Sequence, residues 1–121
     1  MRVTQAFTFE AAHFLTGVSE THRCSRLHGH SYRVEMTFEG PVDPTTGFVA
    51  DFFDIEQQFA PILDQLDHHT LNNVAGLENP TAEHIAAWVF GRWVDVSKRP
   101  YLMNVRVYET PMCWADCGEP T

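Results

Sequence analysis

The chain has 121 residues, of which 44% are hydrophobic, and its formal net charge is −8. This length is enough for one compact domain, expected over residues 1–121, and too short for two. An acidic surface repels nucleic acids and anionic lipids, so we expect neither as a partner. No stretch approaches the roughly 20 apolar residues of a membrane span, and the N-terminus lacks the apolar block of a secretory signal. A cytoplasmic protein is therefore expected.

The first third of the chain contains two predicted strands joined by a polar loop. Over residues 2–12 apolar and polar side chains alternate, which is typical of a strand with one buried face. Residues 14–26 are polar and irregular and are expected to form a loop. A second alternating segment covers residues 28–38, and the prolines and glycines of residues 40–47 end it.

Two helices are predicted in the middle of the chain. Apolar residues recur at helical spacing over residues 53–66, and Pro61 is expected to kink or split that helix. A connection rich in Asn and Asp, residues 67–80, follows it. Thr81 is suited to cap a second helix that extends to about Asp95.

The C-terminal part of the sequence is predicted to form two further strands. Residues 98–100, Lys-Arg-Pro, end the second helix, and residues 101–109 alternate as a third strand, with a short fourth strand near residues 112–115. The apolar face of the third strand is expected to carry Met103, Val105 and Val107. The resulting order, ββααββ, predicts an α+β fold: an antiparallel four-stranded sheet with both helices on one face.

A pair of histidines in the second strand predicts a metal site. Residues two apart in a strand point to the same side, so His28 and His30 emerge together, and Gly29 leaves room for a ligand to approach. His13, near the end of the first strand, is the best third ligand, because antiparallel pairing would bring it beside His28. Three histidines with an open fourth position are typical of catalytic zinc, although they also suit other transition metals.

Cys24 lies in the polar loop, flanked by His22, Arg23 and Arg26. Positive neighbours lower the pKa of a thiol and favour the reactive thiolate. A general base or nucleophile beside the metal is one interpretation of Cys24, and an exposed, unused thiol is the other.

Four further residues carry weaker patterns and are interpreted as ordinary structural positions. A Cys-x-x-x-Cys pair near the C-terminus is a weak metal pattern, because no second pair completes a site. A lone histidine is usually a surface or satisfied core residue. The residues in question are Cys113, Cys117, His22 and His84.

Two acidic positions complete the set of candidate catalytic residues. Asp67 precedes His68 and could orient that imidazole during proton transfer, while His68 and His69 could instead belong to a second metal. Glu109 continues the apolar face of the third strand, where a carboxylate needs a partner such as the adjacent N–H donors of a bound heterocycle. The alternative is that the strand has left the core by Glu109 and the side chain is solvated.

Taken together, these motifs resemble the 6-pyruvoyltetrahydropterin synthase superfamily and, within it, the 6-carboxytetrahydropterin synthase branch of the queuosine pathway. The three residues between Cys24 and His28 are similar to that branch, whereas the pyruvoyl branch typically has a longer gap. The matching segments are residues 9–13 (FEAAH), 24–32 (CSRLHGHSY), 42–52, 66–69, 78–83 and 109–110.

The resemblance implies a tunnelling fold (T-fold), in which three sheets close into a barrel and two such trimers form a homohexamer with active sites at subunit interfaces. It assigns zinc to three ligands: His13, His28 and His30. It further implies Cys24 as catalytic base, and Asp67 with His68 as an acid–His pair from a neighbouring subunit. The resemblance also implies three residues of a pterin pocket, namely Glu109 as the ring anchor and Thr110 and Thr81 as its neighbours.

The activity implied is a zinc-dependent carbon–carbon lyase. It would convert 7,8-dihydroneopterin triphosphate to 6-carboxy-5,6,7,8-tetrahydropterin and release acetaldehyde and triphosphate. On an acidic protein, the basic residues Arg23 and Arg26 could capture the phosphates locally. Two alternatives stay open: a 6-pyruvoyltetrahydropterin synthase that retains the side chain, and a zinc-binding module without turnover. An isolated monomer is expected to bind zinc and to be inactive.

Overall fold

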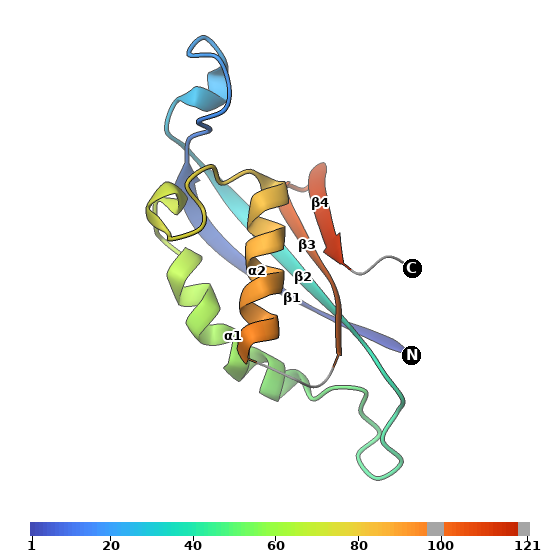
Figure 1. The fold of residues 1–121 in the computed structure, drawn as a ribbon. Coiled ribbons are helices and arrows are strands. Elements are labelled where there is room, and N and C mark those ends of the chain that lie inside the picture. The colour runs from blue at the N-terminus through green and yellow to red at the C-terminus, as the bar shows by residue number, and fades with distance from the viewer. Residues whose placement is uncertain (97–100, 119–121) are drawn as a thin grey trace.

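The computed structural model describes the backbone of residues 1–96 and 101–118 and the side chains of residues 1–93 and 101–118. A four-stranded sheet carries both helices on one face (Figure 1). Its strands are β1 (Arg2–His13), β2 (His28–Glu39), β3 (Tyr101–Thr110) and β4 (Cys113–Gly118), and its helices are α1 (Phe52–Leu66) and α2 (Ala82–Val96). Two short 3-10 helices, η1 (Arg23–Ser25) and η2 (Leu71–Asn73), lie in the connections. The predicted α+β order, ββααββ, is confirmed.

The sheet is an antiparallel meander in the order β1-β2-β3-β4. In the register of the first two strands, His13 lies opposite His28 and Ala11 lies opposite His30. Directly paired residues share a face of a sheet, and residues two apart along a strand share it too. The register therefore puts all three histidines on one face, at the same end of the sheet.

The core fills the space between that face and the helices. Helix α1 packs over β1, where the Phe7 and Phe59 ring centroids are 4.4 Å apart, and α2 packs over β3 and β4. Trp93 of α2 meets Phe38 of β2 with ring centroids 5.5 Å apart. Burying each such side chain stabilises the fold by about 1.5–3 kcal/mol. Other fully buried core residues are Val34, Met36, Ile85, Val89, Val105 and Val107.

Several predicted boundaries and one predicted face are corrected. The strand β1 extends to His13, β2 to Glu39 and β3 to Thr110, because pairing with a neighbouring strand continues beyond the alternating pattern. A bulge at Met103 shifts the register, so Leu102 is buried in its place. The fourth strand covers Cys113–Gly118, later than the predicted residues 112–115.

The helices follow the prediction more closely. Asp51 caps α1, because its side chain accepts the N–H of Phe53, and the helix starts at Phe52, one residue early. Pro61 is exposed on this helix and does not split it. The predicted stop at residues 98–100 lies outside the described residues. Within the described part of the chain, neither helix is long and apolar enough to span a membrane.

Candidate active site

Three histidines and one glutamate converge at the end of the sheet. One potential ligand atom from each of His13, His28, His30 and Glu109 lies within 4.8 Å of the others. His13 is fully buried, and the other three side chains are half-buried. The cluster thus joins the adjacent ends of β1 and β2 to the end of β3, as the sheet order allows.

Backbone carbonyls fix the orientation of two of these rings. His13 Nδ1 is 2.8 Å from the Pro80 carbonyl oxygen, and His28 Nδ1 is 2.7 Å from that of Arg26. Because a carbonyl only accepts hydrogen bonds, each Nδ1 carries the proton and each Nε2 presents a lone pair. The two Nε2 atoms are 3.0 Å apart. Two facing lone pairs repel each other, and a cation between them would convert the repulsion into two bonds.

The third imidazole also has an unsatisfied nitrogen. His30 Nε2 is buried and lies 3.0 Å from Glu109 Oε1, yet the contact lacks the angles of a hydrogen bond. Burial lowers the pKa of both His13 and His30, against the opposing charge of Glu109. A neutral imidazole is the form that binds a metal. The residues present therefore fit a divalent cation such as zinc.

Tyr32 forms the floor of the cluster and was not among the predicted site residues. Its ring centroid is 5.5 Å from that of His30 and 5.9 Å from that of His13. Burial, with a further contribution from Glu109, raises the pKa of its phenol. The hydroxyl is buried and has no hydrogen-bond partner among the described residues. The position of Tyr32 two residues after His30, on the same strand face, is the pattern that would have indicated it.

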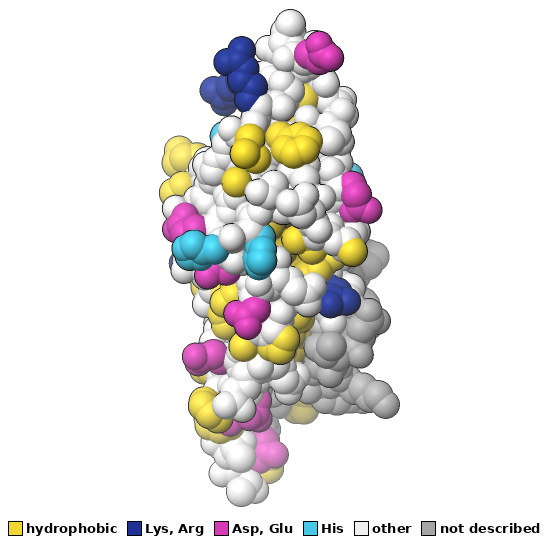
Figure 2. All heavy atoms as spheres, turned by 90° about the vertical axis from the view of Figure 1, so that its left-hand side faces the viewer, with side chains coloured by type: hydrophobic (Ala, Val, Ile, Leu, Met, Phe, Trp, Pro, Cys, Tyr) yellow, Lys and Arg dark blue, Asp and Glu magenta, His cyan; other side chains and the backbone are white. Residues whose placement is uncertain are grey.

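Cys24 lies on η1, inside the loop that joins β1 to β2. The His22 imidazole caps this short helix by accepting the Cys24 N–H at 3.0 Å, and the Cys24 carbonyl accepts the Leu15 N–H at 2.8 Å. The thiol is half-buried, while Arg23 and Arg26 are exposed. Basic side chains gather at this end of the molecule in the space-filling view (Figure 2). The structure thus places the cysteine and its two predicted basic neighbours on one projecting loop.

The Asp67–His68 pair is held against the free edge of β1. Asp67 Oδ1 accepts the Glu10 N–H at 3.0 Å and is 3.0 Å from His68 Nδ1, and the His68 N–H donates to the Glu10 carbonyl at 2.6 Å. These contacts, the Glu10 bond first, lower the pKa of Asp67. His68 has a φ of 61°, unusual for a residue other than glycine, and its side chain is 78% exposed. The pair is therefore well oriented and open to a partner.

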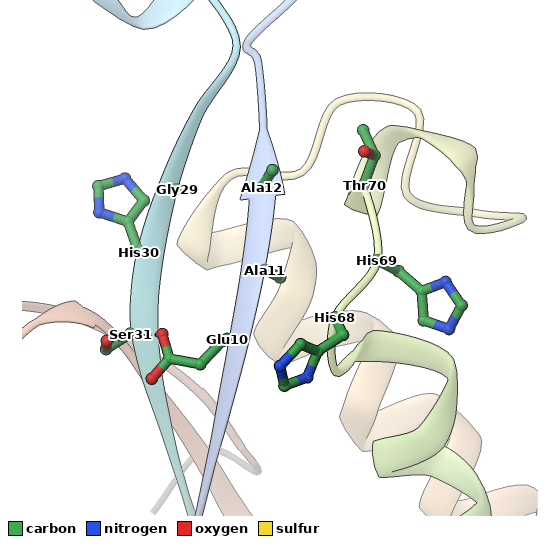
Figure 3. Close-up of a pocket in the computed structure, with 9 residues that line it drawn as sticks. All are labelled: Glu10, Ala11, Ala12, Gly29, His30, Ser31, His68, His69 and Thr70. Carbon is green, nitrogen blue, oxygen red and sulfur yellow. Dashed lines mark hydrogen bonds between the residues drawn. The ribbon is translucent and has the colours of Figure 1, made fainter.

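A pocket of about 480 Å³ lies beside this pair, lined by residues of β1, β2 and the connection that follows α1 (Figure 3). In that view His68 and His69 point away from each other, which gives no support to a second metal there. His30 extends from β2 on the side away from His68. Within the described residues, no hydrogen bond or ion pair joins Asp67 or His68 to Cys24 or to the three histidines.

The two threonines predicted for the pterin pocket have local hydrogen bonds. Thr81 Oγ1 accepts the His84 N–H at 3.1 Å and so caps α2, as predicted from the sequence. Thr110 Oγ1 accepts the Met112 N–H at 3.2 Å in the turn between β3 and β4. Cys113 and Cys117 are free thiols on β4 and lie outside the metal-compatible cluster.

An antiparallel sheet backed by two helices, with a three-histidine cluster at one end, defines the class of this protein as a T-fold with a metal-compatible site. The family model described as 6-pyruvoyl tetrahydropterin synthase matches residues 2–120. The chain belongs to this family, as the sequence motifs predicted.

Individual relatives carry more than one activity in their names. A 6-carboxy-5,6,7,8-tetrahydropterin synthase from Synechocystis sp. is 39% identical over 113 residues, which cover 89% of this chain and 85% of the relative. A dihydroneopterin monophosphate aldolase from Pyrococcus furiosus is 32% identical over 91 residues, covering 75% and 73%. The structure of Caenorhabditis elegans 6-pyruvoyl tetrahydropterin synthase matches with a TM-score of 0.90 at 26% identity, covering 99% of this chain and 96% of that one.

Proposed function

We propose that this chain is a zinc-dependent 6-carboxytetrahydropterin synthase. It would convert 7,8-dihydroneopterin triphosphate and one water molecule to 6-carboxy-5,6,7,8-tetrahydropterin, acetaldehyde and triphosphate, as one cytoplasmic domain on the route to queuosine. The observation that carries the proposal is the convergence of three imidazoles whose Nε2 atoms face no proton donor among the described residues. The name of the Synechocystis relative and the short spacing between Cys24 and His28 favour the carboxy product.

The proposed chemistry divides the work among four side chains. When bound, zinc would supply Lewis acidity toward the hydroxyls of the substrate side chain. The Cys24 thiolate takes the proton from the hydroxyl-bearing carbon, and His68 supports the transfer while Asp67 orients its ring. Glu109 accepts hydrogen bonds from the N–H edge of the pterin, which positions the side chain beside the histidines. Thr81 and Thr110 are proposed as neighbours of the ring.

Within the described residues no hydrogen bond or ion pair joins Asp67 or His68 to Cys24, which supports an active site built from two subunits. Each carboxylate–imidazole pair is oriented by Glu10 of its own chain, and the His68 ring is exposed. We propose that it serves the Cys24 of a neighbouring subunit in a homohexamer. An obligate monomer would then bind zinc without turnover, which sedimentation and activity measured on the same sample would reveal.

Arg23 and Arg26 are proposed to capture the triphosphate. Both flank Cys24 on an exposed loop of a protein whose net charge is −8. A local basic patch attracts a polyanion despite an overall negative field. Replacing both residues with Ala should raise KM for the triphosphate more than for dihydroneopterin, and equal effects on both substrates would contradict this role.

The decisive experiment is incubation of the protein with 7,8-dihydroneopterin triphosphate, with and without a chelator, followed by mass spectrometry. The proposal requires zinc-dependent release of acetaldehyde. A product that retains the side chain would identify a pyruvoyl-type synthase instead. Parallel incubation with 7,8-dihydroneopterin monophosphate tests the aldolase activity named for the Pyrococcus relative.

The Cys24→Ala variant separates catalysis from structural zinc binding. We expect it to keep its zinc and lose turnover, because structural zinc sites are closed and commonly rich in Cys, whereas this cluster is made of histidines. Loss of zinc together with unfolding would make Cys24 a structural ligand and would favour the non-catalytic module.

A further inference from the structure

Two asparagines tie the connection between α1 and α2 to the residues that follow His13. Asn72 Oδ1 accepts the Phe14 N–H at 3.0 Å, and its Nδ2 donates to the Phe14 carbonyl at 2.8 Å and to the Glu78 carbonyl at 3.3 Å. Asn79 Oδ1 accepts the Thr16 N–H at 3.0 Å. These side chains bond Phe14 and Thr16 to the connection, and the Leu15 N–H donates to the Cys24 carbonyl at 2.8 Å, so the chain just beyond His13 is held in place.

The same connection supplies the carbonyl that orients His13. Pro80 follows Asn79 directly, and its carbonyl accepts the buried His13 Nδ1–H at 2.8 Å. On the other side, the Asn79 carbonyl is 2.9 Å from the Thr81 nitrogen and 2.7 Å from His84 Nδ1. The Pro80 carbonyl is therefore fixed from two sides. Before it, Asn79 bonds the chain that follows β1, and after it, Thr81 caps the first turn of α2.

We propose that Asn72 and Asn79 are positioning residues of the metal site. By holding the Pro80 carbonyl against Nδ1, they keep the proton on that nitrogen and direct the Nε2 lone pair of His13 toward the other histidines. A ligand ring that is already oriented loses less freedom when the metal binds, and a direct hydrogen-bond partner of a ligand, here the Pro80 carbonyl, changes metal affinity about 10–100-fold. The inference rests on the proposed metal function.

The chain contains a matched control beside one of these residues. Asn73 is also part of η2, is exposed, and makes no side-chain hydrogen bond within the described residues. Asn72 and Asn79 also differ in whether their side chains act as hydrogen-bond donors or acceptors. Asn79 acts through an acceptor alone, which Asp retains, whereas Asn72 uses two donors to carbonyls, which Asp lacks.

The test measures zinc affinity by chelator competition and the His13 Nδ1–H resonance by NMR in the metal-free protein. Asn72→Ala, Asn72→Asp and Asn79→Ala should each weaken zinc binding about 10-fold, the lower end of the range for direct partners, because they act through the Pro80 carbonyl. The same variants should broaden or shift the Nδ1–H signal. Asn79→Asp and Asn73→Ala should match the wild type in both measurements. Thermal unfolding of each variant reports the folded fraction, to which the affinity is normalised.

Two results would overturn the inference. One is unchanged zinc affinity per folded molecule in Asn72→Ala and Asn79→Ala, with only the melting temperature reduced. The other is an Asn79→Asp variant as weak as Asn79→Ala, since the acceptor would then be irrelevant. If Asn72→Ala does not fold, the comparison of the two Asn79 variants decides. A wild type that binds no zinc would refute the proposed function, while the Nδ1–H signal would still test the positioning.

Discussion

Removing one histidine gives the most direct test of the metal centre, because the arrangement of the three rings makes zinc part of the stability of the fold. The Nε2 atoms of His13 and His28 are 3.0 Å apart, and because each Nδ1 donates to a carbonyl, both Nε2 atoms present lone pairs. Zinc that binds only the folded state stabilises it by RT ln(1 + [Zn]/Kd), which is about 2.7 kcal/mol at 100 times Kd. For a chain of 121 residues this raises the melting temperature by roughly 11 °C, at about 4 °C per kcal/mol.

The His28→Ala variant should lose nearly all of this increment. If loss of a direct ligand weakens binding by the roughly 100-fold that loss of an outer partner can reach, the same zinc concentration only equals Kd. The stabilisation then falls to about 0.4 kcal/mol, or roughly 2 °C. The assay is a thermal melt by circular dichroism with and without zinc, and His69→Ala is the matched control because His69 is exposed and outside the cluster. Equal zinc-dependent shifts in wild type and His28→Ala would refute the reasoning.

Three further changes test the site and the core. Glu109→Gln should leave zinc affinity unchanged and lower kcat/KM roughly 10–100-fold if the carboxylate holds the pterin, as expected for a lost charged hydrogen bond; zinc loss in equilibrium dialysis would instead make Glu109 a metal ligand. Phe59→Ala should cost about 3–5 kcal/mol in urea unfolding, because Phe59 is fully buried against Phe7, whereas Phe53→Ala, at a position 62% exposed on the same helix, should change stability by less than about 0.5 kcal/mol. Since the folded pKa of Asp67 lies below its ordinary 3.8, its stabilising contacts are present above that value and are lost as the pH falls through the lowered folded pKa. The melting difference between wild type and Asp67→Ala should thus shrink as the pH falls from about 5 to about 2; a difference that persists unchanged at about pH 2 would contradict this.

The periodicity of apolar residues was sufficient to predict the strands and helices, because each of them buries one face. The alternation over β1 and β2 and the helical spacing of α1 follow directly from which residues must leave water. The prediction of buried positions was wrong where a β-bulge interrupts the alternation of buried and exposed residues. Met103 occupies a bulge and Leu102 is buried, because the pairing with β2 changes register there, and nothing in the local sequence marks that position. Pro61 was expected to kink or split α1; it is exposed, and the helix continues through it without a split.

The sequence by itself determined that His28 and His30 share a strand face, since a two-residue repeat requires only an extended backbone. It also placed Cys24 among basic residues and Thr81 at a helix start. Only the tertiary structure decided that His13 lies opposite His28, that Glu109 of β3 reaches the same cluster, and that a proline carbonyl orients the buried ring. These contacts join segments far apart in the chain, and strand register and loop docking, which depend on the whole packed core, bring them together.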